Sequence, residues 1–329
     1  MDTPIRSSKA SASILIAGVL FTGLTCAAAQ QDYPNQPIKV VVPILPGAAA
    51  DVLPRIIGEK LAVKFGQPVV FENRPGANSN IGAQAAAAAA PDGYTLLATP
   101  PPPLVANAFL NPRLGFDPTA FVPVSVLAAL PNALVTGPDT PYSSIDSMIR
   151  FAKANPNKLT YASPGVGSSP HLAMEWLKQL AGIEITHVPY NGLAPAMNDV
   201  LGGHVDMVFS NTFNVLPLLR DGKLRVMGVD SESRIPELPD SPAISEIFPG
   251  YVVTTWFAVV APPRTPMQIA EKLSSGIAEA LRQPDVAKKL SDYSAKAIGS
   301  SPTETDDFIK RERERWYQVI AAARLTKSN

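Results

Sequence analysis

The sequence is poor in the side chains that carry covalent and metal chemistry. Its 329 residues include one cysteine, Cys26, and three histidines, His171, His187 and His204. One cysteine excludes an internal disulfide, and the histidines lack the spacing with Asp or Glu that is typical of a metal site. The 28 basic residues balance the 28 acidic ones, so no excess charge favours nucleic acid or an anionic membrane. We therefore predict no metal, no cofactor and no nucleic-acid partner.

Residues 1–29 have the pattern of a secretory signal peptide. A basic start is followed by the mainly apolar residues 14–24 and by a small-residue cleavage pattern at Ala27–Ala29. The apolar segment is too short for a stable transmembrane helix. We expect an exported chain that loses Cys26 on processing. The alternatives are an uncleaved N-terminal anchor and a lipid on Cys26, for which the preceding residues are a poor match.

Short β-rich runs alternate with helical patterns in two separate halves of the remaining chain. The first half has expected strands at 38–42, 69–72 and 94–98, and expected helices at 51–65 and 81–90. The second half has expected strands at 133–135, 159–162, 183–189, 205–209 and 224–229, and expected helices at 144–154 and 194–201. The run 251–260 could cross back to the first half, and helices are expected at 266–282 and 302–323. This order predicts an α/β fold with two domains, each a mainly parallel sheet flanked by helices, which close around a ligand by hinge motion.

Two turns, one in each half, follow a strand-like run and open a helix. The first turn is residues 43–51 (PILPGAAAD), and the second turn is residues 163–171 (SPGVGSSPH). A helix N-terminus presents unpaired N–H groups and the positive end of the helix dipole, and therefore favours an anion. Two such ends facing each other would bind a small carboxylate without an Arg or Lys. The turns thus indicate a binding protein rather than a catalyst.

An enzyme is the main alternative, with Ser168 or Ser169 as nucleophile and His171 as base. However, the second turn lacks the G-x-S-x-G pattern, and a histidine this close on a helix start points in another direction. We expect Ser168 or Ser169 to cap the helix, with Pro170 in its first position. A serine esterase or hydrolase and a ligand-sensing subunit of a signalling system remain as alternative functions.

Three further polar loops follow predicted strands. They begin at Thr99-Pro100, at Tyr190-Asn191 and at Ser210-Asn211. In open α/β sheets, ligands bind at the carboxyl ends of the strands, where all of these loops are expected. Residues 100–103 are four prolines, which lack N–H groups and can only shape a wall.

Several segments resemble the Bug family, the periplasmic substrate-binding proteins of tripartite tricarboxylate transporters. These segments are residues 33–43, 66–76, 90–97, 163–172, 187–190 and 201–203, and their order and spacing cover essentially the whole mature chain. The resemblance implies a Venus-flytrap fold with domain I at 30–130 plus 253–329 and domain II at 131–252. It also implies a periplasmic monomer without enzyme activity, which binds a small carboxylate and delivers it to the membrane components of the transporter.

In that family, backbone groups of the loop that corresponds to residues 46–51 and ordered water hold one carboxylate. The turns, the strand ends and the resemblance together give one set of predicted ligand-binding residues. The set is Pro46, Gly47, Ala48, Ala49, Ala50, Asp51, Thr99, Pro100, Gly165, Gly167, Ser168, Ser169, His171, Tyr190, Asn191, Ser210 and Asn211.

The chain departs from the family pattern at several of these positions. The family usually has a Gly-Gly-rich turn in place of residues 47–50, polar Ser or Thr in place of residues 100–103, often Asp in place of Ser210, and commonly a basic residue in place of Asn191. An Asp at Ser210 would suit a ligand amino group. Its absence, with the other changes, predicts a carboxylate with a less polar body, aromatic or longer aliphatic, rather than an acidic amino acid.

Overall fold

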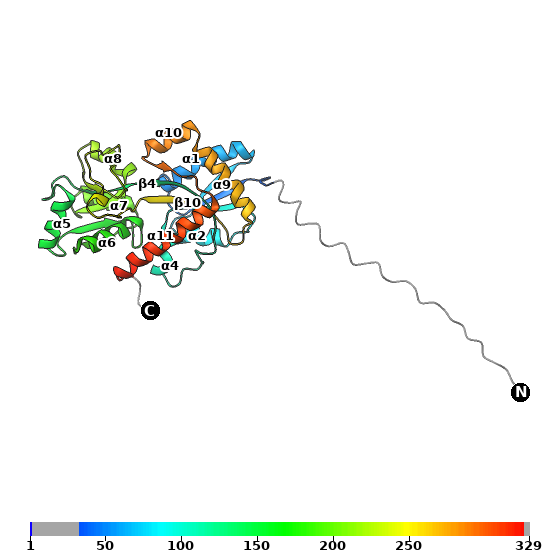
Figure 1. Cartoon of the computed structure of the whole chain (residues 1–329), viewed down its shortest axis with the longest axis horizontal. Coiled ribbons are helices and arrows are strands. Elements are labelled where there is room, and N and C mark those ends of the chain that lie inside the picture. The colour runs from blue at the N-terminus through cyan, green and yellow to red at the C-terminus, as the bar shows by residue number, and fades with distance from the viewer. Residues whose placement is uncertain (2–32, 326–329) are drawn as a thin grey trace.

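The structure is a computed structural model that describes residue 1 and residues 33–325. The predicted signal peptide and Cys26 lie outside the described residues. Within residues 33–325, no helix combines the length and apolar character needed to cross a bilayer. The elements form two separate β-sheets with helices packed around them (Figure 1).

The first sheet has the strand order β11-β4-β10-β3-β1-β2. Its strands are β1 (Ile38–Val42), β2 (Val69–Asn73), β3 (Thr95–Thr99), β4 (Val122–Leu130), β10 (Thr255–Ala261) and β11 (Lys296–Ala297). The helices between them are α1 (Ala49–Phe65), α2 (Asn80–Ala87), α3 (Pro102–Val105), α4 (Asn107–Leu110), α9 (Met267–Leu281) and α10 (Pro284–Asp292). Strand β1 pairs in parallel with β2 and β3, as expected for strands joined through helices.

The second sheet has the strand order β7-β6-β8-β5-β9. Its strands are β5 (Asn132–Thr136), β6 (Thr160–Ser163), β7 (Thr186–Pro189), β8 (Met207–Asn211) and β9 (Arg225–Val229). Its helices are α5 (Ile145–Ala154), α6 (Ser169–Ala181), α7 (Leu193–Leu201) and α8 (Thr212–Arg220), and a 3-10 turn η1 (Ile244–Glu246) precedes the return to β10.

The predicted α/β class with two helix-flanked sheets is confirmed, but the expectation of mainly parallel sheets needs correction. In the first sheet, β10 runs antiparallel to β3 and β4, and β11 runs antiparallel to β4. In the second sheet, β5 runs antiparallel to β8 and β9. The parallel strands come from β-α-β units, whereas β4, β5, β9 and β10 flank the two places where the chain passes between the sheets. There no crossover helix dictates a parallel direction.

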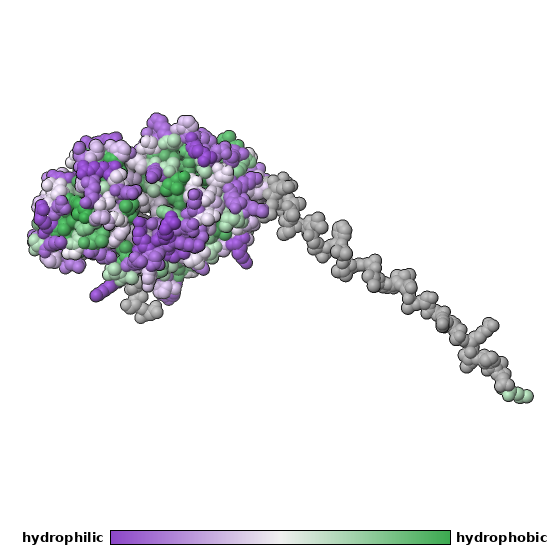
Figure 2. Space-filling model, viewed as in Figure 1, coloured by the Kyte–Doolittle hydropathy of each residue, from purple (hydrophilic) through white to green (hydrophobic). Residues whose placement is uncertain are grey.

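The chain passes between the sheets at Pro131, which alone separates β4 from β5, and again between β9 and β10. Helix α11 (Pro302–Ala322) runs beside these passages, with helices α5–α8 on one side and α1, α2, α9 and α10 on the other (Figure 1). Hydrophilic residues gather over α11 on the face shown in Figure 2. One buried cluster combines Leu97 of the first sheet, Tyr161 of the second and Trp316 of α11, so the two sheets share a core on this side.

Candidate functional site

The predicted turns and loops lie at the carboxyl ends of the parallel strands in both sheets. In the first sheet, Val42 at the end of β1 pairs with Asn73 at the end of β2. In the second, Ser163 at the end of β6 pairs with Pro189 at the end of β7, and β8 runs parallel to β6. Each sheet therefore presents its helix N-termini and strand-end loops along one edge, the usual ligand edge of an open α/β sheet.

The first turn is held by the carboxylate of Asp51. Gly47 takes a φ of 89°, which favours glycine, and Ala48 precedes α1 in an extended conformation. One oxygen of the buried Asp51 accepts the N–H of Gly47 (3.0 Å), and the other accepts Arg55 Nε and Asn73 Nδ2 (both 2.9 Å). Burial acts to raise the pKa of Asp51, but these hydrogen bonds outweigh it and lower that pKa below its ordinary value. Asp51 is thus ionised at neutral pH, and both of its carboxylate oxygens accept hydrogen bonds from the protein.

Three main-chain donors remain at the start of α1. The N–H groups of Ala48, Ala49 and Ala50 donate to no other group of residues 33–325. Ala48 is exposed beside the exposed Pro46, whereas the side chains of Ala49 and Ala50 are buried against the core. The methyl groups anchor the helix start while the amides at its positive end stay unpaired, which is the arrangement an anion needs.

The second turn is capped by a serine. Gly165 and Gly167 have φ values of 140° and 80°, and Ser168 precedes α6 in an extended conformation. The Ser168 hydroxyl donates to the carbonyl of Gly165 (2.7 Å) and accepts the N–H of His171 (3.4 Å). The expected helix cap is therefore confirmed at Ser168, with Pro170 in the second helical position rather than the first.

His171 lies beneath the second turn. Its side chain is buried, and Nδ1 accepts the N–H of Gly167 at 3.1 Å. The ring packs on His187 at a centroid distance of 4.1 Å, and His187 packs on Tyr161 at 4.7 Å. Burial lowers the pKa of His171 to about 3, so the ring is neutral and carries its proton on Nε2. His171 supports the turn in this structure, and a direct contact from it to a ligand stays a prediction.

A serine–histidine pair is present, but its serine is sealed. Ser163 Oγ lies 2.7 Å from His187 Nε2, and Ser163 has no exposed surface. Of the two predicted nucleophiles, Ser168 has its hydroxyl bound to a carbonyl instead of an imidazole. Ser169 is buried, and the nearby imidazoles of His171 and His187 bind Gly167 and Ser163 instead. A nucleophile needs both a base within hydrogen-bond distance and access to substrate, and none of these serines combines the two, which weighs against the hydrolase alternative.

Thr99 and Pro100 lie where the sequence predicts them, at the end of β3. Thr99 is buried, and its hydroxyl donates to the carbonyl of Pro100 at 3.0 Å. The following prolines begin the short helix α3, where the missing N–H costs nothing because a first-turn amide has no partner within the helix.

The remaining predicted residues occupy the strand ends of the second sheet. Tyr190 donates its hydroxyl to Asp199, and Asn191 is exposed. Ser210 is buried at the end of β8, and Asn211 precedes α8 with its side chain half-buried. Hydrogen bonds join no residue of the first turn to the second turn within the described chain.

Comparison with known proteins shows the family to which the chain belongs. The model of the tripartite tricarboxylate transporter family receptor matches residues 53–325. The chain belongs to this receptor family. It is 36% identical over 301 residues to Protein BugT of Bordetella pertussis, covering 91% of this chain and 92% of that protein. It is also 38% identical over 313 residues to a protein encoded in the tcbD-tcbE intergenic region of Pseudomonas sp. strain P51, covering 94% and 93% of the two chains.

Solved structures of the receptor family share the fold. A Rhodopseudomonas palustris protein, Rpa4515 with adipate, is 35% identical with a TM-score of 0.82, and covers 89% of this chain and 98% of its own. MatC from the same organism, with bound malate, is 31% identical with a TM-score of 0.79, covering 88% and 100%. The periplasmic binding protein BugD is 29% identical with a TM-score of 0.80, covering 90% and 100%. The resemblance to the Bug family is confirmed.

Sequence reasoning missed the residues of the first sheet's loops that touch the second turn. Asn78 Nδ2 donates to Asn107 Oδ1 (2.8 Å) and lies 3.4 Å from the carbonyl oxygen of Val166. Gly167 has a φ of 80°, which favours glycine, and a Cβ there would lie 2.3 Å from a methyl carbon of Leu110 in α4, so a larger residue would also have to displace that side chain. These contacts join segments far apart in sequence. The only available signal was the polar loop of residues 73–80, which a single sequence cannot pair with a partner.

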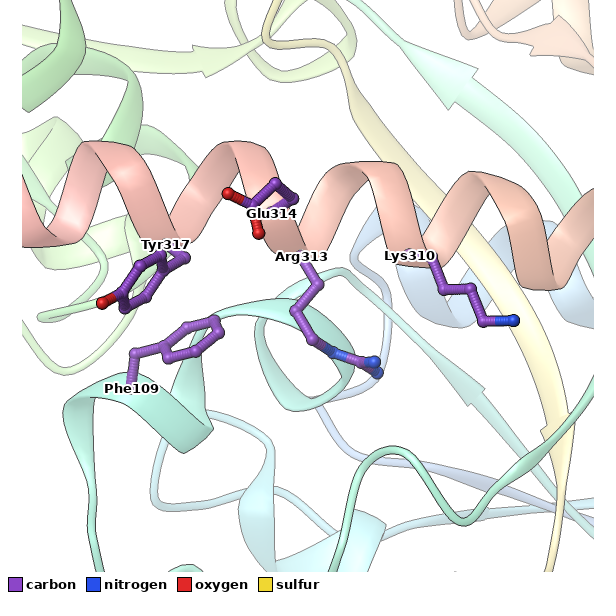
Figure 3. A pocket seen from close by; sticks show the side chains of 5 residues that line it. All are labelled: Phe109, Lys310, Arg313, Glu314 and Tyr317. Carbon is purple, nitrogen blue, oxygen red and sulfur yellow. The ribbon is translucent and has the colours of Figure 1, made fainter.

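A hollow of about 320 Å³ lies between α4 and α11, apart from the predicted residues (Figure 3). Phe109 and Tyr317 face each other across it at a ring distance of 5.0 Å. Arg313 extends from α11 to donate to the carbonyl of Leu104 at 3.0 Å. The other cation in its lining, Lys310, pairs with Asp306, so both cations of the hollow already have protein partners.

Proposed function

We propose that this protein is a periplasmic solute receptor that binds a small carboxylate between two lobes and delivers it to the membrane components of a tripartite tricarboxylate transporter. The first lobe would comprise residues 30–130 and 253–329, and the second residues 131–252. The receptor would act as a monomer. The observation that carries this proposal is the set of unpaired main-chain N–H groups at the start of α1.

Amide donors suit the task because they are fixed by the helix before the ligand arrives. A hydrogen bond from such a group to a charged oxygen contributes ~1.5–3 kcal/mol, so three of them give about 5–9 kcal/mol. Taken alone, these contacts would give dissociation constants from about 0.2 mM to about 0.3 µM, and the cost of immobilising the ligand weakens the net affinity below that. Asp51 does not repel the ligand, because Arg55 and Asn73 neutralise and bind its carboxylate.

The ligand would carry an apolar body between its polar ends. Leu45 in the first turn and Val166 in the second are both more than half exposed, at 65% and 53%. Exposed apolar side chains beside unpaired amides match a carboxylate attached to a hydrocarbon chain or ring. We expect adipate to bind more tightly than malate, and aspartate and citrate to bind weakly.

Calorimetry with these four acids tests the proposal. The informative variant is Ala48→Pro, because Ala48 has a φ of −78°, which proline accepts, and the substitution removes one N–H. The matched control, Ala48→Gly, keeps the amide at a position where glycine is well tolerated. We expect about tenfold weaker binding of adipate for Ala48→Pro, the loss of one charged hydrogen bond, and little change for Ala48→Gly.

Equal affinity in both Ala48 variants would contradict a role for the α1 amides. Failure of every carboxylate to bind the unmodified protein would contradict the receptor proposal as a whole. Preference for aspartate or citrate would contradict only the expected apolar body.

A further inference from the structure

Asn132 occupies the place where the chain enters the second sheet. It is the first residue of β5, directly after Pro131, and it has no exposed surface. A buried amide is costly unless each of its donors and acceptors finds a partner. The partners of this side chain therefore show what it is built to hold.

All four hydrogen-bonding positions of the Asn132 amide are filled. Nδ2 donates to Asp230 Oδ2 (2.5 Å) and to the carbonyl of Val253 (3.4 Å), and Oδ1 accepts Asn211 Nδ2 (2.6 Å) and Thr255 Oγ1 (3.1 Å). Asp230 follows β9, Val253 precedes β10, Asn211 is the last residue of β8, and Thr255 is the first residue of β10. One side chain thus joins four segments, two of which belong to the return passage between the sheets.

Backbone bonds fix the same junction. The N–H of Asn132 donates to Asp230 Oδ1 at 2.7 Å, and the N–H of Asp230 donates to the carbonyl of Asn132 at 3.0 Å. Val253 donates its N–H to the carbonyl of Asp230 at 3.0 Å. Reversal of the amide would set Oδ1 against the carbonyl oxygen of Val253, which can only accept, so the network admits one orientation only.

We propose that Asn132 is a positioning residue that couples Asn211, at the ligand edge of the second sheet, to both passages between the sheets. Loss of its Nδ2 donors would break the bonds to Asp230 and Val253 and let the separation of the two lobes vary. Asn211, which is bound to Oδ1, would then no longer be linked through Asn132 to those two residues. The role of Asn211 in this inference rests on the proposed function. The tie between the passages does not.

The variant Asn132→Asp tests the coupling, because it replaces the two Nδ2 donors with a carboxylate oxygen facing Asp230. The other charged or titratable groups at the junction are Arg315 of α11 and Tyr251, whose hydroxyl donates to the carbonyl of Ala173. Arg315 binds the carbonyl of Val252 and the carboxylate of Glu312. Below the raised pKa of the pair, two adjacent buried carboxyls share one proton, and the protonated one donates to the other. Above that pKa both ionise and repel, so the variant loses the contact at high pH and regains a bond at low pH.

Electron-spin distance measurement without ligand provides the readout. Spin labels are placed on Val63→Cys in α1 and Leu201→Cys in α7, both exposed, in a Cys26→Ser background where no other cysteine remains. We expect Asn132→Asp to broaden the distance distribution at about pH 9.5, above the raised pKa of the carboxyl pair, and to recover the parental distribution at about pH 5. The control Asn198→Asp, an exposed position on α7, keeps the parental distribution at both pH values.

A parental distribution for Asn132→Asp at both pH values would overturn the proposal, as would equal broadening at both, which indicates general loosening. If circular dichroism shows this variant unfolded, Thr255→Val replaces it, since it removes one donor at nearly constant volume. Thr255→Val should broaden the distribution and weaken adipate binding about fivefold, and no change in either would also overturn the proposal. If no carboxylate binds the parent, the proposed function fails, while the distance result still decides this inference.

Discussion

At the scale of single residues, both turns are built on the same device. In each, the N–H of a left-handed glycine donates to a side chain four residues later: Gly47 to Asp51, and Gly167 to His171. The acceptor is a carboxylate in the first turn and a neutral imidazole in the second. One amide of each turn thereby fixes the shape of the turn, and under the proposed function the neighbouring unpaired amides donate to the ligand.

Substitutions of His171 distinguish its support of the second turn from a direct contact with the ligand. His171→Leu removes the acceptor and leaves the Gly167 amide unpaired, so we expect about tenfold weaker adipate binding with the fold retained. His171→Asn keeps an acceptor near Nδ1 and should restore most of the affinity. Calorimetry on both variants measures the difference, and equal losses would show that the imidazole itself contacts the ligand.

At the scale of elements, the strands and long helices follow from hydrophobic spacing and caps. The expected strand at 38–42 has those bounds, and the helix expected at 302–323 is observed at Pro302–Ala322 behind its Ser301 cap. The helix α10 was missed because Pro284, at its start, signals a break as readily as a first turn. Strand β4 was missed because its five consecutive buried residues, 124–128, leave no alternation to detect and Pro123 interrupts its start.

The charge run at residues 310–315 shows where spacing misleads. Its spacing predicts a solvated helix face with pairs four residues apart, and Lys310 does pair with Asp306. Glu312, however, is buried and accepts the indole N–H of Trp256 at 2.9 Å. The partner lies far away in the sequence, so one chain alone cannot reveal that this charge faces the core.

The site was predictable as elements but not as contacts. Strand ends and helix starts follow from local patterns, and the structure puts them on one edge of each sheet. The carboxylate of Asp51 points into the turn because Asn73 and Arg55 donate hydrogen bonds to it. The buried His171 ring beneath Ser168 packs on His187, which comes from another strand. Those partners are set by tertiary packing, which a motif does not encode.

The caps of α6 and α11 offer a matched comparison at this scale. Ser168→Ala and Ser301→Ala each remove a serine cap, and each should lower the free energy of unfolding by ~1 kcal/mol. Only Ser168→Ala should also weaken carboxylate binding, because its turn belongs to the proposed site. Urea unfolding and calorimetry check the pair, and an equal effect on binding would remove the second turn from the site.

At the scale of the whole molecule, buried titratable groups give opposing pH dependences. Burial raises the pKa of Asp230 to about 7, and lowers the pKa values of His171 and His187 to about 3 and about 4. The folded chain holds a proton on Asp230 that the unfolded chain releases, so this group favours folding less as pH rises from about 4 to about 7. The histidines bind protons only in the unfolded chain below about pH 6.5, so they reduce stability as pH falls.

Asp230→Asn removes the contribution of Asp230 to the pH dependence of stability, which opposes the contribution of the two histidines. We expect its stability to fall more steeply than that of the parent between about pH 6.5 and about pH 4, because the histidine contribution is then unopposed. Urea midpoints across this range measure the slope, with the exposed Asp240→Asn as control. Parallel slopes for parent and Asp230→Asn would show that Asp230 does not titrate in this window.

The claim that main-chain amides of both turns bind the carboxylate is tested most directly by amide NMR. Protein labelled with 15N-alanine and 15N-serine is titrated with adipate, or with whichever acid binds most tightly in calorimetry. The amide protons of Ala48, Ala49, Ala50 and Ser169 are predicted to move most, and to move together. Saturable binding that leaves these four amides unshifted would contradict the claim.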